Sequence, residues 1–362
     1  MTSYFYRFDT QVKGRWAGRT LIDVMSNEFI MKPVEYYDKA IQIGNITVNS
    51  EECSKYHILS LGETIQHLVH YHEPDLCDIG VLCLEDDYLV VNKPSGIACH
   101  PTSGYNLFSV TKAFESYGNL SCINRLDVLT SGVLILAFRN AKKYHTEMIN
   151  RRIEKIYVAK VKGHFHDDIT VNAPLKKNRF NVTEVSEEGK EATTVFKRLF
   201  YHNGHSLVEC RPLTGRSHQI RVHLKSLNFP IVNDPVYNGE VSDIPDKSVV
   251  GKENHLLSSG EYIDYGVKYS GKDTNTDNQG ELNSTKKQAK AYNLLGCTLK
   301  IGCNTPGNYS AKEKFAIDSC RGDNTRAFRN MDKFICLHAH KYVFNGKEYV
   351  AEPPFWAQKD NF

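Results

Sequence analysis

Asn124-Arg-Leu-Asp-Val-Leu-Thr-Ser-Gly132 is a polar turn sequence that runs directly into the apolar segment Val133-Leu-Ile-Leu-Ala-Phe138. The six apolar residues predict a buried strand, and the turn residues predict a rigid loop in front of it. Asp127 on such a loop can be partly desolvated, and it can act as a nucleophile or base if a cation keeps it ionised. Asp in a turn also commonly caps backbone groups, so this segment alone leaves both roles open.

A second distinctive segment is Leu213-Thr-Gly-Arg-Ser-His-Gln-Ile-Arg-Val-His-Leu224, which lies in a window without acidic residues between Glu209 and Asp234. Apolar residues at i, i+4 and i+7 predict a helix over 217–227. This spacing places Arg221 beside the apolar seam, where its planar guanidinium can reach a buried carboxylate. The alternative is a solvated basic helix face, although ordinary exposed helices carry residues of both signs.

Segments with a strand pattern outnumber segments with a helix pattern. Helices are predicted over 140–152 and 217–227, from their charged or amphipathic spacing. The predicted strands are Tyr88–Asn92, Val133–Phe138, Lys155–Lys162, Thr193–Phe200, Ser206–Cys210 and Phe334–Phe344. Because strands and helices do not alternate along the chain, we expect an α+β fold with a mixed sheet and flanking helices.

The 362 residues divide into three regions by composition. Residues 12–72 carry two short helix patterns followed by short strands, and they form a small unit. The strand-rich region, 80–237 with 334–358, is expected to form the main domain. Residues 238–333 hold 10 of the 24 glycines and many polar residues, so we expect a partly disordered insertion that loops outside the main domain.

Composition excludes several protein classes. Val133–Phe138 is the longest apolar run, and a membrane helix needs about 20 apolar residues. The 10 cysteines are scattered singly, which suits free thiols in a reducing compartment. The first residues lack the apolar core of a secretory signal, so we expect a cytoplasmic protein, with the mitochondrion and the nucleus as open alternatives.

The net charge of only +3 hides a local basic patch. Residues 139–162 contain eight Lys and Arg residues against two Glu residues. Within this patch, Tyr157 lies on a predicted strand between lysines. A half-buried Tyr on a strand usually serves packing, but a basic patch with an aromatic residue also suits contact with nucleic acid.

No metal site is predicted. Three pairs of histidines stand at i and i+2, namely His70 with His72, His164 with His166, and His338 with His340, and none has further ligands at zinc spacing. Cys297, Cys303 and Cys320 in the insertion could bind zinc together with a fourth ligand, which is the weaker alternative.

Taken together, these segments resemble the RluA-type pseudouridine synthases. The signature of that family is His-Arg-Leu-Asp, two variable residues and Thr-Ser-Gly before an apolar strand, and Arg125–Asp127 with Thr130–Gly132 match it. Residues 86–101, the Lys155-Ile-Tyr157 stretch and residues 214–223 are similar to three further family motifs. The resemblance covers about 86–237 and 334–357, and Asn124 stands where most members have His.

The resemblance implies a mainly antiparallel pseudouridine-synthase sheet and isomerisation of a uridine in RNA to pseudouridine, without a cofactor. Asp127 would start cleavage of the glycosidic bond, by attack on either the base or the sugar. Arg221 would pair with Asp127, and Tyr157 would serve as a stacking platform and as the base for the final proton. Arg125 would fill the space left by a flipped base. The residues expected to contact RNA are Arg125, Lys93, Arg216, His218, Arg151 and Lys155.

Residues 12–72 resemble a degenerate α-L RNA-binding domain of the ribosomal-protein type. Val12-Lys-Gly-Arg-Trp16 and the closing Pro-Phe-Trp-Ala are similar to the eukaryotic branch of the family that modifies tRNA. The expected partner is therefore tRNA, with uridine-32 of the anticodon stem-loop as the target of a monomeric enzyme. The alternatives are an rRNA substrate, or an RNA-binding chaperone of the same fold that has lost catalysis.

Overall fold

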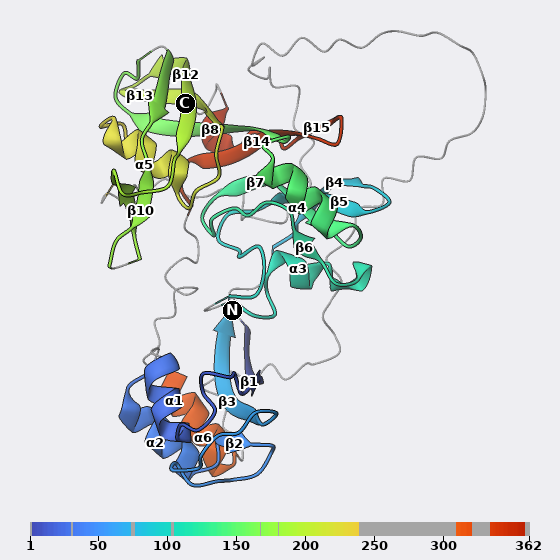
Figure 1. Ribbon diagram of the computed structural model, residues 1–362. Coiled ribbons are helices and arrows are strands. Elements are labelled where there is room, and N and C mark those ends of the chain that lie inside the picture. Colours follow the sequence, from blue (N-terminus) through green and yellow to red (C-terminus); the bar gives the residue numbers. More distant parts are fainter. Residues whose placement is uncertain are drawn as a thin grey trace, which may run out of the picture. The chain divides into compact units, whose positions relative to one another are not determined.

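The computed structural model describes residues 2–29, 32–73, 77–102, 105–166, 168–179, 181–238, 309–320 and 334–358 (Figure 1). The chain divides into two compact units. The N-terminal unit spans 1–75 together with 294–329, and the sheet unit spans 76–293 together with 330–362. The chain therefore leaves the first unit, enters the second, returns to the first and ends in the second.

In the part of the chain that the structure describes, the N-terminal unit combines a small antiparallel sheet with three helices. Its strands are β1 (Thr2–Gln11), β2 (Ile46–Val48) and β3 (Thr64–Glu73), in the order β1-β3-β2. Its helices are α1 (Leu21–Glu28), α2 (Val34–Gln42) and α6 (Ala311–Cys320). The two helices expected within 12–72 are present, whereas β1 and α6 come from outside that range.

Helix α6 comes from the segment that we expected to be a polar insertion. Its first turn has the capping-box pattern Ser-x-x-Glu, in which the Glu313 carboxylate accepts a hydrogen bond from the Ser310 backbone N–H at 2.9 Å. Its Phe315 ring stacks on Tyr36 of α2, with ring centroids 5.3 Å apart. The carbonyl of Lys312 accepts a hydrogen bond of 2.9 Å from the Asn45 side chain. This part of the insertion therefore helps to complete the N-terminal unit.

The sheet unit is built on a sheet of ten strands. Along its main path the order is β4-β5-β7-β14-β8-β13-β12-β9, with β6 beside β7 and β15 beside β14. The strands are β4 (Gly80–Leu84), β5 (Tyr88–Lys93), β6 (Ser121–Cys122), β7 (Ser131–Ala137), β8 (Glu154–Lys162), β9 (Asp168–Asn172), β12 (Thr193–His202), β13 (His205–Pro212), β14 (Leu337–Phe344) and β15 (Lys347–Val350). Among these strands only β7 and β14 pair in parallel, so the expectation of a mixed, mainly antiparallel α+β sheet is confirmed.

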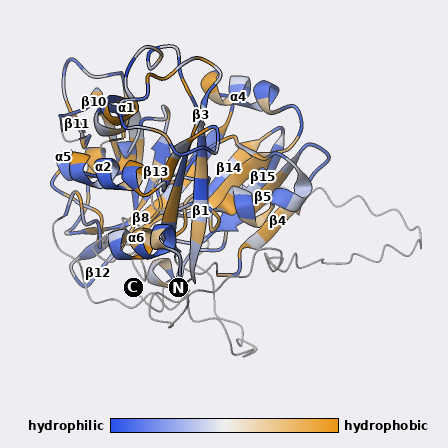
Figure 2. Ribbon diagram, turned by 90° about the horizontal axis from the view of Figure 1, so that it is seen from below, coloured by the Kyte–Doolittle hydropathy of each residue, from blue (hydrophilic) through white to orange (hydrophobic). Residues whose placement is uncertain are grey.

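Short helices and a hairpin surround this sheet. Helix α4 (Ala141–Ile149) packs on it through Tyr144, whose ring meets Tyr88 of β5 edge to face. Helix α5 (Gln219–Ser226) is joined to β12 by a 2.9 Å hydrogen bond between His223 and Thr194. The remaining elements are the hairpin β10 (Leu175–Lys177) and β11 (Thr183–Val185), the short helix α3 (Val110–Ala113), and the 3-10 turns η1 (Glu115–Tyr117) and η3 (Phe355–Ala357). The strands of the large sheet are mostly hydrophobic (Figure 2). Across the described residues, no helix is both long and apolar enough to cross a membrane.

The parallel pairing of β7 and β14 depends on Gly132. Its φ of +113° lies in a region that favours glycine, and a Cβ atom there would lie 2.2 Å from the carbonyl oxygen of Ala339. That oxygen belongs to the backbone of β14, which cannot move aside as a flexible side chain would. The glycine of the Thr-Ser-Gly motif thus allows the strand after the Asp127 turn to approach β14 closely.

We expect Gly132→Ala to destabilise the protein by about 3 kcal/mol or more, because it combines backbone strain with a main-chain clash. Gly204→Ala is the matched control, since Gly204 also has a positive φ, +76°, but a Cβ atom at that position would have nothing within 4 Å of it. That control should cost about 1 kcal/mol. Urea unfolding of both variants measures the difference, and equal losses would contradict the close-approach explanation.

Candidate active site

Asp127 lies on the turn that leads into β7. The backbone N–H of Thr130 donates to the Asp127 carbonyl at 3.1 Å, which closes a four-residue turn. The carbonyl of Val128 on the same turn accepts a 2.8 Å hydrogen bond from the N–H of Gly96. The turn is thus held from both sides, while the Asp127 side chain keeps 30% of its surface exposed. A fixed, partly accessible carboxylate is what nucleophilic or base chemistry requires.

Arg221 joins two carboxylates. Its Nη1 donates to Asp127 Oδ2 at 2.7 Å, so the pairing expected from the sequence is present. Its Nε and Nη2 donate to the two oxygens of Asp234, at 2.7 and 2.8 Å. The bidentate fork therefore faces Asp234, which is fully buried, and a single hydrogen bond reaches Asp127. Asp234 holds Arg221 in place, and Arg221 in turn orients Asp127.

The backbone around Asp234 is arranged for this pairing. The N–H groups of Val236 and Tyr237 donate to Asp234 Oδ1 at 3.0 and 3.1 Å. The Tyr237 ring lies against the Arg221 guanidinium, with the Cζ atom 5.0 Å from the ring centroid. A buried charge cluster is tolerated only when its members are paired and hydrogen-bonded, and each member here is both.

The charge environment keeps Asp127 ionised. Burial by itself would raise the pKa of this carboxyl, but the electrostatic influence of His218 and Arg221 and the hydrogen bond from Arg221 outweigh it and hold the pKa below its ordinary value. The His218 Nε2 atom is 3.7 Å from Asp127 Oδ2. Asp127 is therefore a carboxylate at neutral pH, poised to attack or to accept a proton.

Tyr157 is buried on β8 and its hydroxyl is hydrogen-bonded to the hydroxyl of Tyr342 on β14. Burial, followed by the influence of Tyr342, raises the pKa of Tyr157 well above its ordinary value. The hydroxyl is consequently protonated at neutral pH. This environment suits the expected wall of the site, and it gives no support to the expected role of Tyr157 as a base.

Asn124 connects this pair to β7, the strand that follows the Asp127 turn. Its side-chain Nδ2 donates to the Val133 carbonyl at 3.1 Å and to Tyr342 at 3.3 Å, while its Oδ1 accepts from the N–H of Ile135 at 2.8 Å. An amide can donate and accept at once, so Asn124 bridges two backbone groups of β7. Asn at this position therefore has a structural function of its own.

A model of the family described as RNA pseudouridylate synthase matches residues 87–226, which include Asp127, Tyr157 and Arg221. The mitochondrial tRNA pseudouridine(32) synthase of Saccharomyces cerevisiae is 40% identical over 374 residues, which cover 99% of this chain and 75% of that protein. This chain belongs to the RNA pseudouridylate synthase family.

Two further relatives differ in their sequence identity to this chain and in the share of their own length that it covers. The tRNA pseudouridine(31) synthase of Saccharomyces cerevisiae is 29% identical over 411 residues, covering 99% of this chain and 95% of that protein. Pseudouridylate synthase RPUSD2 of Mus musculus is 40% identical over 247 residues, covering 65% of this chain and 44% of that protein. The chain thus spans less than half the length of the mouse relative.

Lys93 of this pseudouridylate synthase family member is not placed to bind phosphate, which corrects the expectation from the sequence. Its side chain is fully buried, and its ammonium group donates to the carbonyls of Pro94, Ile97 and Val128 at 2.7, 2.8 and 3.1 Å. Burial lowers the pKa of Lys93 to about 8. All three N–H groups of the ammonium are thus used by backbone carbonyls, and they connect the turn that follows Lys93 to the Asp127 turn.

The other residues expected to contact RNA differ in their exposure. Arg125, Arg151 and Arg216 are exposed, and Arg216 Nε donates to the Glu191 carbonyl at 2.9 Å. Lys155 is half-buried, and burial together with the charge of Arg151 lowers its pKa to about 8. His218 is also half-buried, with Nδ1 2.9 Å from the hydroxyl of Tyr237. Arg125 is two residues before Asp127 in the sequence, and His218 Nε2 lies 3.7 Å from the Asp127 carboxylate.

Sequence reasoning missed Asp234, Tyr237 and Tyr342. A signal for Asp234 exists, because this residue ends the long window that lacks acids and is the nearest carboxylate after the basic helix. Tyr342 could be found only through the pairing of β14 with β8, since the two tyrosines are 185 residues apart. The pair of Tyr157 and Tyr342 could therefore be identified only from the three-dimensional structure.

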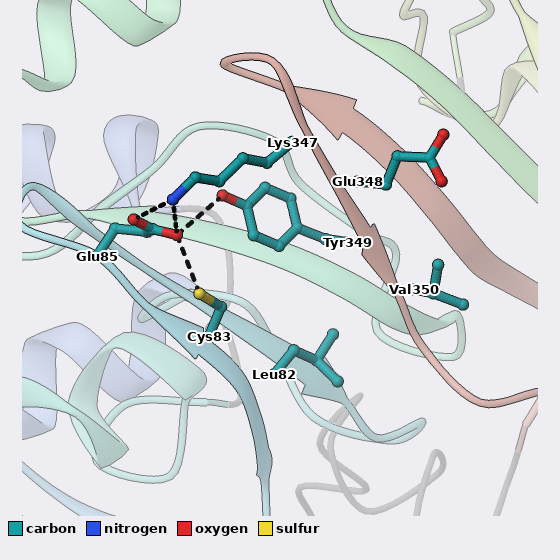
Figure 3. A pocket seen from close by; sticks show the side chains of 7 residues that line it. All are labelled: Leu82, Cys83, Glu85, Lys347, Glu348, Tyr349 and Val350. Atoms are coloured by element: carbon teal, nitrogen blue, oxygen red, sulfur yellow. Dashed lines mark hydrogen bonds and ion pairs between the residues drawn. The ribbon is translucent and has the colours of Figure 1, made fainter. Parts of the chain in front are cut away.

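A shallow depression of about 450 Å³ lies elsewhere on the sheet unit (Figure 3). Its lining comes from β4, β15 and the residue that follows β4, and it includes none of the residues around Asp127. Lys347 Nζ is 2.8 Å from both oxygens of Glu85, and the Cys83 thiol donates to the same carboxylate. The charged side chains of this lining are paired, Lys347 with Glu85 and Glu348 with Lys341 at 3.2 Å, so we do not assign this depression to the reaction.

Proposed function

We propose that this chain isomerises a uridine in tRNA to pseudouridine, with uridine 32 of the anticodon stem-loop as the target. The observation that carries the proposal is the partly exposed Asp127 carboxylate, held at 2.7 Å by an Arg221 that is itself locked by Asp234. The family and the names of the two yeast relatives support the reaction and the class of RNA.

The reaction needs only this chain's residues and the RNA. The bond between N1 of the base and C1′ of the ribose breaks, the base turns, and C5 bonds to C1′. The proton lost from C5 is balanced by the proton gained at N1, so no oxidant, energy source or cofactor enters. Asp127 starts the bond cleavage, and the protonated phenol of Tyr157 forms part of the wall against which the base rests.

The uridine must leave its stack to reach Asp127. Flipping costs a few kcal/mol and costs least for a base that is already partly unstacked, as in a loop. Arg125 is exposed two residues before Asp127, and we propose that it occupies the space that the base leaves. Arg151 and Arg216 supply further exposed positive charge for the phosphates.

The names of the two yeast relatives refer to adjacent tRNA positions, 32 and 31. We choose position 32 because the relative named for it is 40% identical over nearly the whole chain, against 29% for the other. We further propose that the N-terminal unit acts as the α-L-like RNA-binding domain and holds the rest of the tRNA. We also propose that the protein acts as a monomer.

The test uses the purified full-length protein and unmodified tRNA transcripts, with pseudouridine mapped at nucleotide resolution. We expect product at position 32 and none in a matched transcript in which cytidine replaces that uridine. Product at position 31 alone would show that the target uridine is 31 and not 32. Product only in rRNA fragments would show that the substrate is rRNA and not tRNA. No product in any RNA would contradict the enzymatic proposal and favour the binding protein.

A cytoplasmic location stays a prediction, and the name of the yeast relative places that protein in the mitochondrion. Fractionation of cells that express the tagged full chain distinguishes the two compartments. Enrichment with a mitochondrial matrix marker would overturn the cytoplasmic prediction.

A further inference from the structure

The N-terminal unit brings together three side chains that the sequence keeps far apart. His70 and His72 lie at alternate positions of β3, so their rings project from the same face of the strand. Cys320 is the last residue of α6, 250 and 248 residues further along the chain. The sequence offered the two histidines no third ligand, because that ligand arrives on the helix from the insertion.

The three donor atoms form a compact group. Cys320 Sγ lies 3.1 Å from His70 Nδ1 and 3.1 Å from His72 Nε2, and all three atoms lie within 4.8 Å of one another. Tetrahedral zinc with ordinary Zn–S and Zn–N bonds needs sulfur and nitrogen about 3.5 Å apart. The two sulfur–nitrogen distances are therefore within a few tenths of an ångström of those in a zinc site, and the two histidine nitrogens, which lie within 4.8 Å of each other, must approach to about 3.3 Å when the ion binds.

The surroundings of the group also fit a metal. His70 is 6% exposed and Cys320 is 8% exposed, while His72 is half-buried and marks the more open side. The Phe5 ring packs against the His70 ring, with centroids 5.0 Å apart, and so limits its rotation. The Cys320 thiol donates to the Ile317 carbonyl at 2.9 Å, and this proton leaves when the sulfur binds a metal as thiolate. The two contacts of the sulfur with the imidazole nitrogens are then bridged by one ion.

We propose that His70, His72 and Cys320 bind one Zn²⁺ ion. Thiolate and imidazole are the ligands that zinc prefers, and three protein ligands leave a fourth position for water or another ligand. The ion ties the end of α6 to β3 within the N-terminal unit. Its role in this proposal is structural, because β3 and α6, the two elements that the ion joins, both belong to the N-terminal unit.

The first experiment measures zinc in the full-length protein after loading with ZnSO₄ and gel filtration in metal-free buffer. We expect about one zinc ion per chain in the parent protein. Cys320→Ser and His72→Gln should retain less than about a tenth of that zinc under the same conditions. His164→Ala is the matched control, because His164 also belongs to an i, i+2 histidine pair but is exposed in the sheet unit, and this variant should retain all of it.

The second experiment replaces zinc with Co²⁺ and records the absorption spectrum. We expect a thiolate-to-cobalt charge-transfer band in the near ultraviolet for the parent protein and its loss in Cys320→Ser. If Cys320→Ser fails to fold, His72→Gln carries the comparison, since its half-buried ring is less critical for packing. A folded parent protein that binds neither ion would overturn the proposal, and so would full zinc binding by Cys320→Ser, because the ion would then reside elsewhere.

Discussion

Asp127→Asn is expected to reduce pseudouridine formation by about 10⁴-fold or more, equivalent to about 5.5 kcal/mol of transition-state stabilisation. The amide keeps the size of the carboxylate and one oxygen for Arg221, but it cannot act as a nucleophile or as a base. RNA affinity should change by less than about tenfold, because contacts with phosphates provide most of it. Release of tritium from C5-labelled uridine measures the reaction, and filter binding measures affinity.

The matched control for this variant is Asp168→Asn, which removes an exposed carboxylate at the start of β9 in the same unit. It should leave the reaction rate within about twofold of the parent, as expected for a surface change. Turnover by Asp127→Asn at the parental rate would contradict the assignment of the nucleophile or base. Loss of RNA binding in parallel with activity would show instead that the substitution damages the whole site.

Arg221→Lys is expected to lower kcat by about 100-fold or more, with a much smaller effect on KM. Lysine keeps the positive charge, but one ammonium group cannot reproduce three hydrogen bonds directed at two carboxylates. Asp127 would keep a counter-ion and lose its fixed orientation. Stability should fall by about 1–3 kcal/mol, because Asp234 stays buried with poorer partners.

The control for Arg221→Lys is Arg211→Lys, which changes an arginine that is 47% exposed and paired with Glu154 and Glu209. Exposed ion pairs contribute little, so both kcat and stability should stay near the parental values. A second variant, Asp234→Asn, retains the Arg221 and Asp127 side chains but weakens the bidentate contact that fixes Arg221, so it should reproduce the loss in kcat. If Asp234→Asn kept the parental kcat, Arg221 would orient Asp127 without its contact to the Asp234 carboxylate.

The elements that the sequence predicted correctly are those with a strong local signal. The strands β5, β7, β8, β12, β13 and β14 were predicted because buried central strands are continuous apolar or alternating runs. Helix α5 was predicted from its apolar spacing, which placed Arg221 beside the apolar seam, whereas the pairing of Arg221 with Asp127 was expected from the family resemblance. The fold class followed from the order of these elements.

The features that the sequence did not reveal depend on tertiary contacts. Helix α6 lies in a region whose polar composition hid it, although the Ser310–Glu313 capping pattern was a local signal. Lys93 sits in a turn whose composition suggested exposure, and only the packing of two turns buries it. Asp234 and Tyr342 acquire their functions from partners that are distant in sequence.

The central position of β14 has a consequence for the synthesis of the protein on the ribosome. Its neighbours β7 and β8 are complete long before β14 is translated, and His338 meets Ser131 across 207 residues of chain. At translation rates of about 5–20 residues per second, those neighbours wait for about 10–40 s with unpaired backbone groups on the edges that β14 will occupy. Unpaired strand edges invite aggregation. The nascent chain should therefore depend on chaperones during this interval, and fragments that end before residue 337 should aggregate instead of forming the sheet.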